Sequence, residues 1–145
     1  MCNRLSPVTV TRKDLQKLTS IRLREAELPL SANAPDGAYY LAGYAVECGL
    51  KACIAKSTGR HDFPNLKRAQ DSYKHKAKDL YVVAGLKSAL EEAMRQSEFA
   101  LRWETVIQWS EESRYSSHSL QEASDLIEAI ENRKHGILQW LKKHY

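Results

Sequence analysis

The stretch AYYLAGYAVECGLKACIAK, residues 38–56, decides the fold class of this chain. It spans more than five helical turns, contains only three charged residues, and has small residues every three or four positions, at Ala38, Ala42, Ala45, Gly49 and Ala52. This spacing places the small side chains on one face of a helix, where another helix can approach closely. A second apolar stripe on the adjacent face is formed by Tyr39, Val46, Leu50 and Cys53. A helix that is apolar on two faces is predicted to be the central helix of an all-α domain.

The flanking sequence continues the helical pattern. Capping boxes at Thr11–Asp14 and Ser119–Glu122 predict two helix starts. Pro29 should end or kink the first helix near Glu27 or Leu28, and Asp36 should cap the second. Residues 57–74 are predicted to be an irregular connection, followed by a short helix at 75–84 and a long periodic helical pattern from 86 to 107. A polar connection is predicted at 110–119, and a short amphipathic turn or helix from 137. We therefore predict an antiparallel, up-and-down four-helix bundle with additional short helices, a single domain over residues 1–145.

The amino-acid composition limits the class of protein to which this chain can belong. The chain has 145 residues, 43% of them hydrophobic and 28% charged, which is typical of one globular domain. No continuous apolar run is long enough for a membrane helix or a secretory signal, so we expect a cytoplasmic protein that does not bind membranes. Three cysteines without a metal-binding spacing argue against a disulfide framework and a structural zinc site.

Charge is unevenly distributed along the sequence. The formal net charge is +4, but residues 80–132 hold four basic and ten acidic residues and so carry −6. Residues 56–79 and 133–145 carry +4 each. A nucleic-acid site within the acidic stretch therefore requires the fold, or a second subunit, to bring a basic segment beside it.

The histidines have cations nearby in the sequence, and those considered as candidates are His61, His75, His118 and His135. A neutral histidine can accept a proton and an arginine can hold a phosphate, which are the requirements of metal-independent RNA cleavage. For each histidine–cation pair, the alternative to a catalytic role is that the histidine is simply exposed or caps a helix. Around Arg114 the alternative is an ion-pair network with Glu111 and Glu112, and for Glu47 it is an i,i+4 pair with Lys51. If Glu47 is buried, it needs a hydrogen-bond partner such as a tyrosine or arginine of another helix.

Four segments together resemble the HEPN-domain family. They are Asp36–Ala52, Asp71–His75 with Leu80, Trp109–Tyr115 and Lys134–Leu138, so the resemblance covers nearly the whole chain from Leu15. It implies an antiparallel helical bundle that commonly dimerises. Many members are ribonuclease toxins encoded beside a minimal nucleotidyltransferase antitoxin, and others lack nuclease activity. Their catalytic signature is an arginine followed, after four to six residues, by a histidine.

The resemblance assigns roles to residues of this chain. Arg114 would hold the scissile phosphate, His118, after only three intervening residues, would be the base, and Tyr115 would support them. His75, Lys74, Lys76 and Glu47 are the candidate nucleotide- or RNA-binding residues. No metal or other cofactor is implied. We therefore expect a homodimeric HEPN-type domain acting on RNA or nucleotides. The resemblance places such a domain in a toxin–antitoxin or defence module with a nucleotidyltransferase partner. The alternative is a non-catalytic nucleotide-binding or protein-interaction module.

Overall fold

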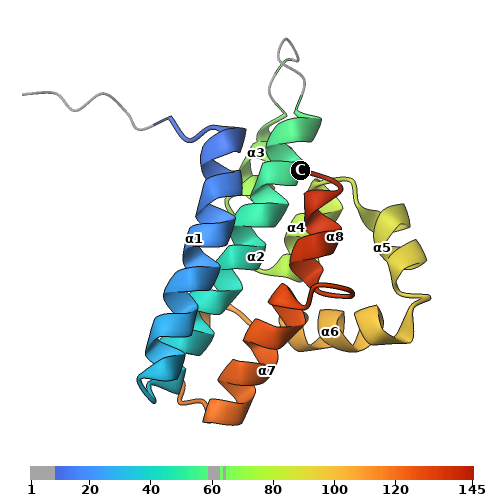
Figure 1. Ribbon diagram of the computed structural model, residues 1–145. Coiled ribbons are helices and arrows are strands. Elements are labelled where there is room, and N and C mark those ends of the chain that lie inside the picture. The colour runs from blue at the N-terminus through green and yellow to red at the C-terminus, as the bar shows by residue number, and fades with distance from the viewer. Residues whose placement is uncertain (1–8, 59–62, 64) are drawn as a thin grey trace, which may run out of the picture.

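The computed structural model describes residues 9–58, 63 and 65–145 of the chain. The described residues form eight α-helices and one 3-10 helix and contain no strand, which confirms the all-α prediction (Figure 1). The helices are α1 (Arg12–Ser31), α2 (Pro35–Ser57), α3 (Leu66–Ser72), α4 (Ala77–Val83), α5 (Lys87–Ala93), α6 (Ser97–Ile107), η1 (Glu111–Tyr115), α7 (Leu120–Glu131) and α8 (Ile137–Lys142). The antiparallel four-helix bundle remains a prediction.

Helix α1 begins as predicted but ends later. The Thr11 side chain accepts a hydrogen bond from the Asp14 backbone at 3.2 Å, and Asp14 bonds back to Thr11. Of the two outcomes predicted for Pro29, an end near Glu27 or Leu28 is wrong, because α1 continues through Pro29 to Ser31. Pro29 lies in the last turn, where its missing N–H removes a single helical bond. After Pro29, the backbone N–H of Ala32 still donates to the Leu28 carbonyl and that of Ala34 to the Pro29 carbonyl. Asn33 has a left-handed conformation, with φ of 61°, and forms the turn into α2.

Helix α2 is the centre of the domain, as predicted. It pairs with α1 along its length and also contacts α4, α7, α8 and η1 (Figure 1). All five members of its small-residue stripe are buried. Its N-cap is Ala34, so the prediction that Asp36 caps the helix is wrong; Asp36 lies in the first turn and accepts a hydrogen bond from His118 instead.

Two connections differ from the sequence-based prediction. Residues 57–74 are not wholly irregular, since α3 lies within them and is capped by the Asn65 side chain. The long pattern from 86 to 107 is two helices, because Arg95 and Gln96 make tight i→i−3 backbone bonds that end α5. The break turns the chain so that Phe99 of α6 packs on Trp140 of α8, with ring centroids 5.6 Å apart.

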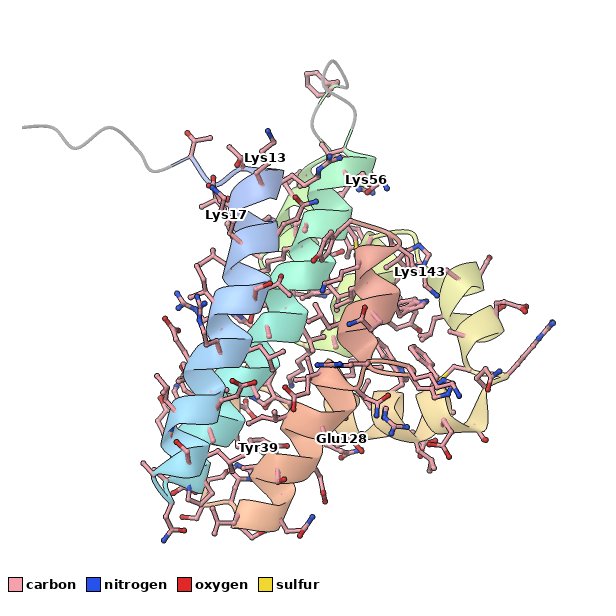
Figure 2. All side chains as sticks on the ribbon, viewed as in Figure 1. Lys13, Lys17, Tyr39, Lys56, Glu128 and Lys143 are labelled. Carbon is pink, nitrogen blue, oxygen red and sulfur yellow. The ribbon has the colours of Figure 1, made fainter. Side chains whose placement is uncertain are left out.

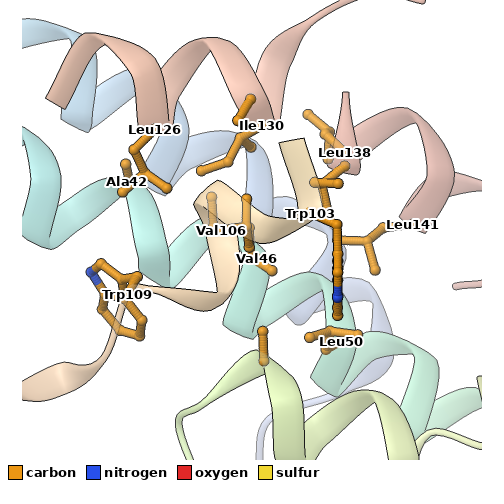
Figure 3. Packing of buried hydrophobic residues seen from close by; sticks show 14 of the residues in the cluster. Ala42, Val46, Leu50, Trp103, Val106, Trp109, Leu126, Ile130, Leu138 and Leu141 are labelled. Carbon is orange, nitrogen blue, oxygen red and sulfur yellow. The ribbon is translucent and has the colours of Figure 1, made fainter. Parts of the chain in front are cut away.

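Helices α2, α6, α7 and α8 supply most of the core shown in Figure 3, and α1, α4 and α5 add buried residues to it. All three tryptophans are buried in it, as the sequence suggested, and Trp103 packs edge-on against Trp140. Trp109 lies against α2 at Gly43, where a Cβ atom would come within 2.0 Å of the indole ring. Gly43 therefore allows Trp109, and the η1 segment that follows it, to approach the α2 backbone. No helix in the described part of the chain is long and apolar enough to cross a membrane.

Candidate functional site

Four polar side chains follow one another along a single face of α2. Tyr40, Tyr44, Glu47 and Lys51 are spaced by four, three and four residues, the spacing that places side chains above one another on a helix. We call this set the polar strip. It interrupts an otherwise apolar helix and lies where α2 contacts η1 and α4. The residues before α4 and those of η1 complete the site.

Glu47 is a buried carboxylate in the middle of the polar strip. Only 7% of its side chain is exposed, and its Oε1 accepts a hydrogen bond from Lys51 Nζ at 2.8 Å. The predicted i,i+4 pair is thus confirmed. The second partner is His75, whose Nδ1 lies 3.1 Å from the same oxygen, rather than the expected tyrosine or arginine. Glu47 therefore anchors the segment before α4 to α2 and orients the His75 ring, 43% of which is exposed.

The two tyrosines of the polar strip are linked to each other. Their hydroxyl oxygens are 3.1 Å apart, and their rings meet edge to face. Tyr44 also packs edge-on against Trp109, with ring centroids 5.0 Å apart. Burial, followed by the hydrogen bond with Tyr40, raises the pKa of Tyr44, so this hydroxyl stays neutral. The tyrosine pair thus links α2 to Trp109, which lies just before η1 in the chain.

Helix η1 presents Arg114 to solvent beside the polar strip. The Arg114 guanidinium lies 4.8 Å from the centroid of the Tyr115 ring, a cation–π contact. The hydroxyl of Tyr115, and then that of Tyr40, raises the pKa of Arg114. The ion-pair network predicted with Glu111 and Glu112 is wrong, since among the described residues Arg114 makes no ion pair. Its charge is therefore free for a ligand.

His118 is held in a different setting from Arg114. Its ring stacks on Tyr39, with centroids 3.7 Å apart, and its backbone N–H donates to Asp36 Oδ1 at 2.6 Å. Its Nε2 is buried without a partner. Because consecutive helix positions point about 100° apart, Tyr39 and Tyr40 hold His118 and Arg114 against different faces of α2. As placed here, His118 Nε2 cannot accept a proton from a substrate in solvent.

A basic segment does lie beside η1. A surface pocket of about 380 Å³ is lined by Gln70, Tyr73, Lys74, His75, Lys76, Asp79 and Glu111. Lys74 is already paired with Asp71 at 3.0 Å, whereas Lys76 makes no ion pair with any described residue. Tyr73, which the sequence did not single out as a site residue, is 80% exposed at this pocket. Its sequence signal is the alternation of aromatic and basic residues from Tyr73 to Lys76.

The remaining positive charge lies elsewhere. Lys13, Lys17, Lys56 and Lys143 gather toward the end of the molecule away from Tyr39 (Figure 2). Burial lowers the pKa of His144, and the nearby Lys56 and Lys143 lower it further. The fold thus brings the basic segment around residue 75 to η1 and leaves Lys13, Lys17, Lys56 and Lys143 toward the other end (Figure 2).

The histidine–cation pair at His61 lies outside the described residues. Where side chains are described, no three metal-binding residues gather as a metal ion requires. Comparisons with protein-family models, curated proteins and solved structures found no match for this chain.

Proposed function

We propose that this chain is a HEPN-type module that binds single-stranded RNA or nucleotides through Arg114 and the pocket beside it. The observation that carries the proposal is the exposed Arg114 guanidinium, which stacks on Tyr115 and has no carboxylate partner among the described residues. Arginine in this state holds phosphate oxygens through two parallel hydrogen bonds.

Two exposed aromatic rings give the site a second means of recognition. Tyr115 is 79% exposed next to Arg114, and Tyr73 is exposed beside Lys74 and Lys76. Glu111, from the same helix as Arg114, lines the pocket that holds Tyr73. Bases of a single strand stack on exposed aromatic side chains while basic groups hold the backbone. The alternation of cations and aromatic rings supports binding of an unpaired strand in preference to a duplex.

Within this proposal Glu47 acts through His75. A buried carboxylate that already accepts from Lys51 and His75 has little surface left for a ligand. Glu47 instead fixes the His75 ring at the pocket edge, where the ring can donate or accept a hydrogen bond through Nε2.

The test is binding of a fluorescently labelled single-stranded RNA, followed by anisotropy at low salt. Replacing Arg114 with glutamine should weaken binding about tenfold, because charge-assisted hydrogen bonds contribute roughly 1.5–3 kcal/mol. Arg24→Gln is the matched control, since Arg24 is an exposed α1 arginine outside the site and its replacement removes the same charge. Equal affinities of the two variants would contradict the proposal.

Metal-independent cleavage of RNA by Arg114 and His118 is the second candidate. The observation that favours it is that both side chains contact neighbouring residues of α2, at Tyr39 and Tyr40. Because His118 Nε2 is buried, cleavage requires the 116–118 segment to move when RNA binds. The assay is RNA cleavage in the presence of a chelator. Loss of cleavage in His118→Ala supports this candidate, and cleavage unchanged from that of the parent protein refutes it.

The same proposal includes the homodimer and the nucleotidyltransferase partner that the resemblance implies. It also includes a role in a toxin–antitoxin or defence module. They are checked by measuring the mass of the protein in solution and by co-purifying the product of a neighbouring gene. A protein-interaction module that binds no RNA is the outcome if the anisotropy experiment fails.

A further inference from the structure

A second basic pocket lies away from the polar strip, between α8 and the corner where α5 meets α6. It has a volume of about 150 Å³ and shares no lining residue with the polar strip or the pocket at His75. Its lining combines cationic, amide and apolar groups: Ala93, Gln96, Phe99, Lys134, His135, Gly136, Gln139, Trp140 and Lys143. No carboxylate lines it. We propose that this pocket binds a phosphomonoester or inorganic phosphate.

The charge of the pocket is uncompensated. Lys134 and Lys143 make no ion pair with any residue that the structure describes. The two acidic residues adjacent to lining residues in the sequence are Glu92, paired with Arg95 at 3.0 Å, and Glu98, paired with Arg102 at 2.9 Å. Two lysines, and a histidine that can carry a proton, match the nearly doubly negative charge of a phosphomonoester better than the single charge of a carboxylate.

The backbone around the pocket is fixed before any ligand arrives. Asn132 Oδ1 accepts hydrogen bonds from the N–H groups of Lys134 and His135, at 3.0 and 2.9 Å. The Gly136 N–H donates to the Asn132 carbonyl at 2.9 Å, and a Cβ at Gly136 would come within 2.4 Å of that oxygen. This closed turn holds Lys134 and His135 at the pocket, so little ordering is needed when an anion binds.

The apolar and amide groups complete the site. Phe99 and Trp140, which line the pocket, are packed against each other and are almost fully buried. They exclude water from one side, which strengthens the attraction between the lysines and an anion. Gln96 and Gln139 supply amide N–H groups that can donate to the remaining phosphate oxygens.

The experiment is an NMR titration of the ¹⁵N-labelled full chain with inorganic phosphate, and in parallel with adenosine 5′-monophosphate, at constant ionic strength. The backbone amides of His135 and Gly136 and the Trp140 indole N–H should shift in a saturable manner. The double variant Lys134→Gln/Lys143→Gln should weaken binding at least tenfold, as expected from the removal of two charge-assisted hydrogen bonds. If adenosine 5′-monophosphate gives saturable shifts and inorganic phosphate does not, the ligand of the pocket is a phosphomonoester and not free phosphate.

The matched control is Lys142→Gln, because Lys142 is exposed, adjacent to Lys143 and outside the pocket. It should change the affinity, read from the backbone amides of His135 and Gly136, by less than twofold. The proposal is overturned if neither probe gives saturable shifts, or if Lys142→Gln weakens binding as much as the double variant. Circular dichroism of each variant confirms that the helices are retained.

Discussion

Replacing Gly43 with alanine tests the contact that connects the core to the proposed site. The new Cβ would lie 2.0 Å from Cδ2 and Cε2 of Trp109, far inside van der Waals contact. Because the indole is rigid and buried, the overlap should cost about 3 kcal/mol, the upper end of the range for an overpacked core. Alanine has a higher helix propensity than glycine, which returns about 0.5–1 kcal/mol. We therefore expect a net loss of about 2 kcal/mol in the free energy of unfolding.

Gly37→Ala is the control in the same helix. There the new Cβ would meet only Pro29, at 3.6 Å, which is an ordinary contact, so the protein should gain about 0.5–1 kcal/mol. Urea unfolding followed by circular dichroism gives both values. If Gly43→Ala does not fold, adding Trp109→Leu should restore folding, because the smaller side chain relieves the overlap. Equal stability of Gly43→Ala and Gly37→Ala would refute the packing described for Trp109.

Three further predictions follow from ionisable groups. Glu47→Ala should lower the free energy of unfolding in urea by about 1–3 kcal/mol, because Lys51 and His75 lose their shared acceptor. The control Glu104→Ala removes an exposed carboxylate and should change this free energy little. Burial, and then Glu27, raises the pKa of Glu131 above its ordinary 4.5. The folded protein therefore binds a proton at Glu131 more tightly than the unfolded chain does, and the protein loses stability as the pH rises through this pKa. Glu27→Gln should therefore stabilise the protein at pH 7 more than at pH 4, and the opposite order of urea midpoints would contradict the contact. Burial also raises the pKa of Cys48 and of Cys53 to about 11. In a Cys2→Ser variant, both thiols should therefore react slowly with iodoacetamide at pH 8 until urea unfolds the protein. Rapid labelling of the folded protein would contradict their burial.

Local sequence signals predicted the helices well where a single interaction decides the outcome. The Thr11 and Ser119 capping boxes each depend on residues three positions apart, and both form. The burial of the α2 small-residue stripe follows from its spacing alone. Pro29 shows the limit of such signals, because its cost depends on how near it lies to the end of the helix. The break between α5 and α6 has no glycine or proline to mark it, and it follows from the packing of Phe99 on Trp140.

The site was harder to predict, because its residues come from segments far apart in the sequence. Arg114 and His118 are close in the chain, but stacking on Tyr39 turns His118 away. The contact between Glu47 and His75 spans 28 positions and depends on how α4 packs on α2. The −6 net charge of residues 80–132 likewise could not show that the basic segment at residue 75 would lie beside η1. Tertiary packing, and not any motif, determines these relations.

The most direct test of the central claim is the ratio of RNA dissociation constants of Arg114→Gln and Arg24→Gln, measured by anisotropy in the same buffer. Both variants lose one positive charge, so a difference between them reports on the position of the charge and not on net charge. If Arg114 holds a phosphate, the ratio should be about ten. A ratio near one would contradict the claim that Arg114 and the pocket at His75 form the RNA-binding site.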